Sequence, residues 1–194
     1  MTLLRVLTYG DERLLVRSEP IAEMTDDLRQ LIADMAETMY AAKGAGLAAP
    51  QVGVAGRLFV LDVDQVDENG QKKRPRRLRV YINPNIIETS KEDSPYVEGC
   101  LSIPGIEMEI YRPARIRLHY RDEQWQEHEE EIEGLLARVI QHESDHLDGV
   151  LFVDRLGFVK RQTLAAQLRR LRNERETIVV PAALTTDEEK HPPM

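Results

Sequence analysis

Residues 135–149 read LLARVIQHESDHLDG. Apolar side chains recur there with a helical period and place His142 and His146 on their stripe, which predicts a helix over 135–147. Side chains four residues apart share a helix face and are separated by roughly 6 Å along the axis, so the two imidazoles can reach one metal ion. Glu143, turned by about 100° from His142, would flank that ion without having to bind it.

The identity of a third ligand decides what kind of metal site this is. Beyond the motif the chain offers only His191 and glutamates near its C-terminal end, which are poor candidates. Upstream, the segment EGCLS at 98–102 holds Cys100, the single cysteine of the chain. A thiolate, two imidazoles and one open position form a catalytic four-coordinate site. A lone cysteine is more often a small buried apolar residue, so spacing alone leaves Cys100 open.

A third segment, GAGLAAPQ at 44–51, is built from small residues and ends in a glutamine. Small residues allow a backbone to approach a ligand closely, and the Gln51 amide can donate a hydrogen bond to an oxyanion. The alternative interpretation is a helix end followed by an ordinary loop.

The rest of the pattern predicts one mixed domain. A helix over 25–42 has Thr25 as its N-cap and buries a stripe of leucine, isoleucine and methionine. A last helix over 157–176 completes a domain of residues 1–176, and the polar tail 177–194 is expected to be disordered. The predicted strands cover 57–63, 78–84, 106–112, 115–122 and 127–134, and the first two form a hairpin whose polar tip, 64–77, contains the turn signal Asn69-Gly70.

Composition excludes several classes of protein. The 194 residues carry a net charge of −8, which argues against a general nucleic-acid binder, DNA included, but still allows a local basic patch. No apolar run approaches the roughly 18 residues of a membrane span, and the first residues contain no secretory signal. A single cysteine permits no intrachain disulfide, so a reducing cytoplasm is the expected location.

Taken together and in this order, the three segments resemble the peptide deformylase family. That family carries a glycine-rich segment ending in glutamine, then Glu-Gly-Cys-Leu-Ser, then Gln-His-Glu-x-x-His-Leu. The resemblance runs from the N-terminal helix to about residue 155. It implies an α+β fold in which antiparallel strands wrap around a central metal-binding helix, with an N-terminal and a C-terminal helix.

The resemblance also implies an activity. The chain is then a metal-dependent hydrolase that removes the N-formyl group from the formyl-methionine of newly synthesised polypeptides and releases formate. Cys100, His142 and His146 hold one divalent ion, with Fe²⁺ preferred and Zn²⁺, Ni²⁺ or Co²⁺ able to replace it.

Further roles follow from the same resemblance. Glu143 serves as general base and general acid. The Gln51 amide and the backbone N–H of Leu101 stabilise the oxyanion, and the backbone of Gly46 helps to hold the substrate.

Two positions depart from the family pattern and bear on the substrate. Ala45 is smaller than the aliphatic residue that the family often has, which widens the substrate mouth. Glu107 stands where some relatives have a basic residue, so the preference for residues after the first one is left open.

Two other functions are compatible with a Cys/His metal site but lack a ligand in this sequence. A zincin-like peptidase needs a third ligand downstream of the motif, where no good candidate exists. A binding protein with a structural zinc ion needs a fourth protein ligand, and none is evident.

The predicted C-terminal helix is basic on an acidic protein. Three leucines, Leu164, Leu168 and Leu171, form a narrow stripe that would dock on the domain and leave the arginines outside. A solvated helix face is the ordinary interpretation. The family resemblance makes a weak, salt-sensitive contact with ribosomal RNA the sharper one. The basic residues are Lys160, Arg161, Arg169, Arg170, Arg172 and Arg175, against Glu174 and Glu176.

Overall fold

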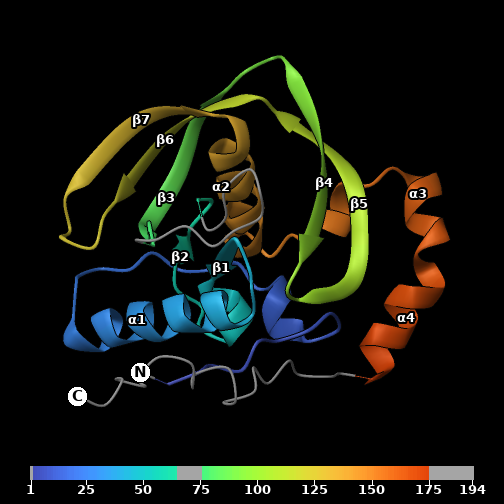
Figure 1. The fold of residues 1–194 in the computed structure, drawn as a ribbon, viewed down its shortest axis with the longest axis horizontal. Coiled ribbons are helices and arrows are strands. Elements are labelled where there is room, and N and C mark those ends of the chain that lie inside the picture. Colours follow the sequence, from blue (N-terminus) through green and yellow to red (C-terminus); the bar gives the residue numbers. More distant parts are fainter. Residues whose placement is uncertain (1, 65–75, 175–194) are drawn as a thin grey trace, which may run out of the picture.

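The computed structural model describes residues 2–64 and 76–174. Its centre is α2 (Gly134–Leu147), the helix predicted from the histidine spacing, and strands enclose it from two sides (Figure 1). The predicted α+β arrangement of antiparallel strands around this helix is confirmed. Among the described residues, no helix is both long enough and apolar enough to span a bilayer.

One side of α2 is covered by a five-stranded antiparallel sheet. Its order is β1 (Gly46–Ala48), β2 (Leu58–Leu61), β3 (Arg79–Thr89), β6 (Arg115–Arg121) and β7 (Glu127–Glu133). The pairing of β2 with β3 confirms the predicted hairpin, whose Asn69-Gly70 tip lies outside the described residues. The inward side chains of the sheet pack against α2 in a core that includes Phe59, Leu61, Tyr81, Leu118, Ile140 and Leu147.

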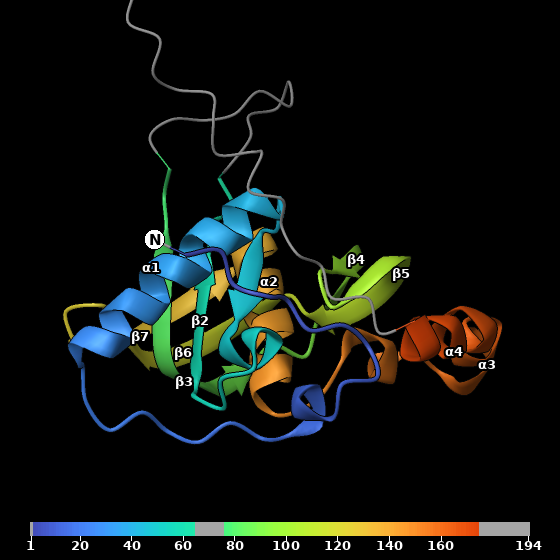
Figure 2. The same ribbon diagram turned by 90° about the horizontal axis from the view of Figure 1, so that it is seen from below.

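The N-terminal helix α1 (Asp26–Ala41) crosses the sheet beside β1 and β2 (Figure 2). The prediction of its N-cap is confirmed, because the hydroxyl of Thr25 accepts a hydrogen bond from the Leu28 N–H at 3.1 Å. This bond satisfies one of the free N–H groups at the helix start. The apolar stripe is buried as expected, with Ile32, Met35 and Met39 in one cluster with residues of β2.

The second side of α2 is covered by a separate hairpin of β4 (Asp93–Cys100) and β5 (Ile103–Pro113). Strand β4 was not predicted from the sequence. Its segment has no alternating apolar pattern, because only Glu98 among its residues is buried. A register shift between Glu98 and Cys100 ends the regular pairing just before the turn. Such irregularities redirect a side chain, and here they turn Cys100 toward α2.

The prediction of one helix over 157–176 is wrong. The chain forms α3 (Phe158–Thr163) and α4 (Ala165–Glu174), which lie at one side of the molecule (Figure 2). The hydroxyl of Thr163 donates to the Lys160 carbonyl at 2.7 Å, and the Leu164 N–H bonds to the Arg161 carbonyl instead. The side chain has taken the acceptor that the next helical turn needs, so the helix is interrupted.

The leucine stripe of the C-terminal region docks as predicted. Leu164 and Leu168 are buried in one cluster with Leu7 and Phe152, and Leu171 packs against its edge. Arg175, Glu176 and the tail predicted to be disordered lie outside the described residues. Within the part of the chain that the structure describes there are also three short 3-10 helices, η1 (Glu12–Leu15), η2 (Ala49–Val52) and η3 (Phe152–Arg155).

Candidate metal centre and active site

The three predicted metal ligands meet at the centre of the fold. Cys100 comes from the end of β4, and His142 and His146 come from successive turns of α2. Their ligand atoms all lie within 4.8 Å of one another, and the Cys100 Sγ is 3.2 Å from the His146 Nε2. Glu98 accepts a hydrogen bond from the His142 Nδ1 at 2.9 Å. This bond fixes the ring, so that the Nε2 of His142 is left to face the cluster.

The donor set fits a divalent metal ion. One thiolate and two imidazoles suit zinc and other first-row divalent ions, and they leave a fourth position open for a reacting ligand. Burial would lower the pKa of His142, but its hydrogen bonds to Cys100 and Glu98 outweigh burial and raise the pKa to about 10. Burial and the neighbouring His142 lower the pKa of His146. A metal ion binds a neutral imidazole, so binding of a cation would displace the extra proton of His142.

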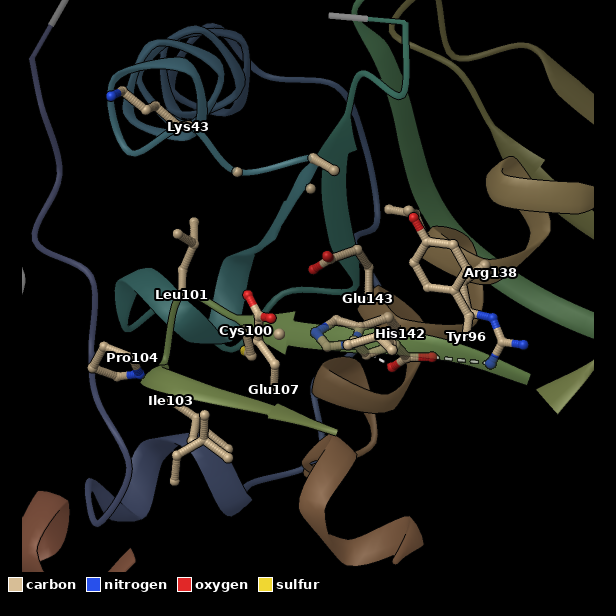
Figure 3. A pocket seen from close by; sticks show the side chains of 18 of the residues that line it. Lys43, Tyr96, Cys100, Leu101, Ile103, Pro104, Glu107, Arg138, His142 and Glu143 are labelled. Carbon is tan, nitrogen blue, oxygen red and sulfur yellow. Dashed lines mark hydrogen bonds and ion pairs between the residues drawn. The ribbon is translucent and has the colours of Figure 1, made fainter. Parts of the chain in front are cut away.

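Glu143 projects from α2 into the cavity beside this cluster (Figure 3). Its side chain is buried, and its Oε2 has no hydrogen-bond partner among the described protein atoms. Burial raises the pKa of Glu143 to about 7, although the charge of His142 opposes the shift. A carboxyl group with a pKa near neutrality can both take up and give back a proton at physiological pH.

The glycine at position 46 is required by the position of this carboxylate. A Cβ built on Gly46 would lie 2.8 Å from the Glu143 carboxyl carbon and closer still to its Oε1. Any larger residue would therefore push Glu143 away from its position. Gly46 thus supports Glu143 directly, a role that the sequence analysis did not foresee.

The oxyanion donors predicted from the sequence lie at the same place. Gln51 is buried, and its Oε1 accepts from the Ala48 N–H at 2.8 Å, which fixes the orientation of the amide. Its Nε2 donates to the Ser102 hydroxyl at 3.1 Å and makes a longer contact of 3.6 Å with the Cys100 sulfur. The second N–H of this amide therefore points toward the metal ligands. Leu101, which follows Cys100, lines the same cavity.

The cavity has a volume of about 480 Å³. On one wall are Ala45 and Gly46, of which Ala45 is exposed to solvent. Opposite them lie residues of the β4–β5 hairpin, and α2 forms the floor (Figure 3). Among the predicted site residues only His146 does not line the cavity, although its Nε2 is 3.2 Å from the Sγ of Cys100, which does.

A buried ionic network beneath the ligands was missed by the sequence analysis. Arg112, whose side chain is 1% exposed, donates to both carboxylate oxygens of Glu98 at 2.7 and 2.9 Å and to Asp145 at 2.7 Å. Arg138 also donates to Glu98, at 3.0 Å, and Arg155 pairs with Asp145. Burial would raise the pKa of Glu98, but hydrogen bonds from His142 and Arg112 outweigh it and hold the pKa well below its usual range.

This network supports the metal centre from below. A Glu98 that stays ionised keeps the His142 ring oriented, and Arg112 keeps Glu98 ionised. The only signal in the sequence was the acidic residue of the EGCLS segment, because Arg112 contacts it from the neighbouring strand β5 and Arg138 contacts it from α2.

Comparison with known proteins gives one consistent result. Residues 3–162 match the family model described as Polypeptide deformylase. The chain is 47% identical to a peptide deformylase of Rhizorhabdus wittichii, over 91% of this chain and 99% of that protein. It is 44% identical to a peptide deformylase of Salinibacter ruber, over 96% of this chain and 97% of that protein. Its fold is similar to the crystal structure of the peptide deformylase from Ehrlichia chaffeensis, with a TM-score of 0.79 and 36% identity over 89% of this chain and 98% of that one.

Proposed function

Because the chain belongs to the peptide deformylase family, we propose that Cys100, His142 and His146 hold its metal ion and that Glu143 moves the protons of the reaction. The reaction is the hydrolysis of the N-formyl group of nascent formyl-methionyl polypeptides, which yields formate and a free amine. One observation carries the residue roles. Three metal-binding donors lie within 4.8 Å of one another, and two of them, Cys100 and His142, line the same cavity as the buried carboxylate of Glu143, whose Oε2 has no partner among the described protein atoms.

The side chains divide the work of the reaction between them. When bound, a divalent ion supplies a water molecule of lowered pKa and polarises the formyl carbonyl. Glu143 takes the proton of the attacking water and then gives it to the departing amine nitrogen. The Gln51 amide exchanges its long contact with Cys100 for a hydrogen bond to the carbonyl oxygen as negative charge develops there. The Leu101 N–H donates to the same oxygen.

We propose Fe²⁺ as the physiological ion, with Ni²⁺, Co²⁺ or Zn²⁺ able to take its place. The mixed thiolate and imidazole donors accept all four ions, so the choice depends on availability more than on affinity. An iron(II) ion beside a thiolate is open to oxidation of both metal and sulfur, whereas zinc has no redox chemistry of its own.

The test is a formate-release assay on a short formyl-methionyl peptide. Samples of the protein are loaded without oxygen with Fe²⁺, Ni²⁺ or Zn²⁺ and assayed before and after exposure to air. We expect formate from the iron and nickel forms, and rapid loss of activity in air for the iron form alone. Absence of formate with every metal would contradict the assigned centre. Equal losses in air for the iron and nickel forms would contradict the proposed oxidation beside Cys100.

We further propose that residues 1–176 act as one catalytic domain in the cytoplasm. The burial of Leu164 and Leu168 in a cluster with Leu7 supports the inclusion of the terminal helices in that domain. The nascent substrate and the single unpaired cysteine support the location.

The basic surface of α3 and α4 supports a proposed weak contact with ribosomal RNA. Part of its charge is already paired, because Arg161 contacts Asp154 at 2.8 Å and Arg170 contacts Glu174 at 2.6 Å. Lys160 makes only a 3.8 Å contact with Glu109, so it is available to phosphates, as is the exposed Arg169. Phosphate contacts of this kind weaken steeply with salt.

A double charge reversal tests this contact. The Lys160→Glu/Arg169→Glu variant is expected to lose co-sedimentation with ribosomes at low salt while it keeps its activity on short peptides. The matched control, Lys91→Glu/Arg115→Glu, makes the same change in net charge at exposed residues outside these helices. Equal pelleting of the two variants would show that the basic residues of α3 and α4 face solvent and do not contact the ribosome.

A further inference from the structure

Glu107 places a carboxylate at the mouth of the active-site cavity. It lies on β5, lines the cavity and directs its side chain into it (Figure 3). A Cβ built on Gly99 would be 3.4 Å from the Glu107 Cγ and 3.9 Å from its Oε1. The carboxylate therefore lies over the backbone of the residue that precedes Cys100, within the space that a bound peptide must cross.

The charge of Glu107 has no counterpart in the site. Within residues 2–64 and 76–174, no hydrogen bond or ion pair of Glu107 is found, and the side chain is exposed. The other acidic residues at the cavity differ. Glu98 is paired with arginines, and Glu143 is buried at the reaction centre. Lys43, a cation of the opposite wall, directs its ammonium group away from Glu107 (Figure 3).

The walls beside Glu107 are suited to the backbone of an extended peptide. Gly44 and Gly46 lie on one side and Gly99 and Gly105 on the other. Because glycines have no side chain, this part of the cavity is left largely open. A peptide whose formyl group reaches Glu143 must run out between these walls. Successive side chains of an extended chain alternate in direction, so the one or two residues after methionine pass the carboxylate.

From this placement we infer that Glu107 selects formyl-methionyl peptides with a lysine or arginine in the two positions that follow the methionine. The inference rests on the proposed function and adds a substrate preference to it. The unpaired carboxylate attracts a cationic side chain and repels an acidic one. The sequence had left this preference open, because only the fold shows that the residue reaches the cavity.

The expected size of the preference is modest. An exposed ion pair at contact distance changes an equilibrium by roughly 1.5- to fivefold at low salt. The contact is remote from the formyl carbon and is made equally in the bound substrate and in the transition state. The preference should therefore appear in KM and not in kcat.

The experiment compares three formyl-methionyl tripeptides that carry lysine, glutamine or glutamate after methionine, and a second set with the change one position later. The metal-loaded wild-type protein is expected to favour lysine over glutamate in at least one set. Raising the salt concentration from about 0.01 M to about 0.5 M shortens the Debye length roughly sevenfold and should reduce the preference. Glu107→Gln should abolish it, and Glu107→Lys should reverse it. Glu109→Gln removes the same charge from the same strand outside the cavity and should leave it intact.

The outcomes separate this inference from the function on which it rests. Formate release that is the same for all peptides, or a preference that survives in Glu107→Gln, would overturn the role of Glu107 alone. Failure to release formate from the glutamine peptides would instead contradict the activity itself. A preference that appears in kcat would also overturn the inference, because it would place Glu107 in the chemical step.

Discussion

A Glu143→Gln variant is expected to keep its metal ion and to lose formate release by about a thousandfold, the usual loss when a general acid and base is removed. The amide has nearly the same shape as the carboxylate but cannot take up a proton. Oε2 of Glu143 has no partner among the described protein atoms, so replacing it by an amide nitrogen breaks no hydrogen bond at that atom. Measured on the same samples, the metal content of the variant should therefore equal that of the wild type, while its turnover should fall.

Two further variants make this result specific. Cys100→Ala removes one of three donors and is expected to lose both the metal and the activity, since two imidazoles alone bind far more weakly. Ser144 is next to Glu143 in the sequence, and its hydroxyl also lacks a hydrogen-bond partner among the described protein atoms. Ser144→Ala should therefore leave the metal content and the turnover unchanged. A metal-free Glu143→Gln protein would make the glutamate a ligand instead of a proton carrier.

Arg112→Met is expected to lower the free energy of unfolding by about 3 to 5 kcal/mol, one of the largest effects a single substitution produces. The methionine side chain fills much of the same space, but it leaves Glu98 and Asp145 buried with fewer compensating charges. Urea unfolding of the two proteins, loaded with the same metal, measures the difference.

The partner Arg155 supplies the matched control. It contacts the same Asp145, but its side chain is 45% exposed, so solvent can replace the lost charge. Arg155→Met should therefore cost about 1 kcal/mol or less. Equal losses of unfolding free energy in the two variants would show that the burial of an arginine does not decide how much its ion pairs contribute to stability.

The loss in Arg112→Met should also depend on pH. Glu98 has a lowered pKa in the folded protein, so its ionised form contributes stability above the ordinary carboxyl pKa of 4.5, and this contribution is lost as the pH falls through the folded value. Without Arg112 the pKa of Glu98 rises. Glu98 of the variant then takes up a proton at lower pH, which removes the energetic cost of burying its charge without Arg112. The difference between the two proteins is therefore expected to be larger at pH 7 than at pH 5.

The sequence by itself determined the features that depend on residues close to one another along the chain. The helical spacing over 135–147 placed His142, Glu143 and His146 on one helix, and Thr25 marked the start of α1. Both predictions depend on residues only a few positions apart, and the helical spacing of side chains along the sequence is enough to predict such local features. The order of the three motifs then pointed to the family, and with it to Cys100 and Gln51.

Tertiary structure alone decided the features that depend on distant residues. Cys100 meets His146 across 46 positions, and Glu98 meets His142 across 44. No periodicity predicted β4, since its one buried side chain is the charged Glu98 and not an apolar residue. Arg112 looked like any charged strand residue until the fold enclosed it between two carboxylates. A buried charge is stable only with its partners in place, and those partners are brought together by the packing of the hairpin on α2.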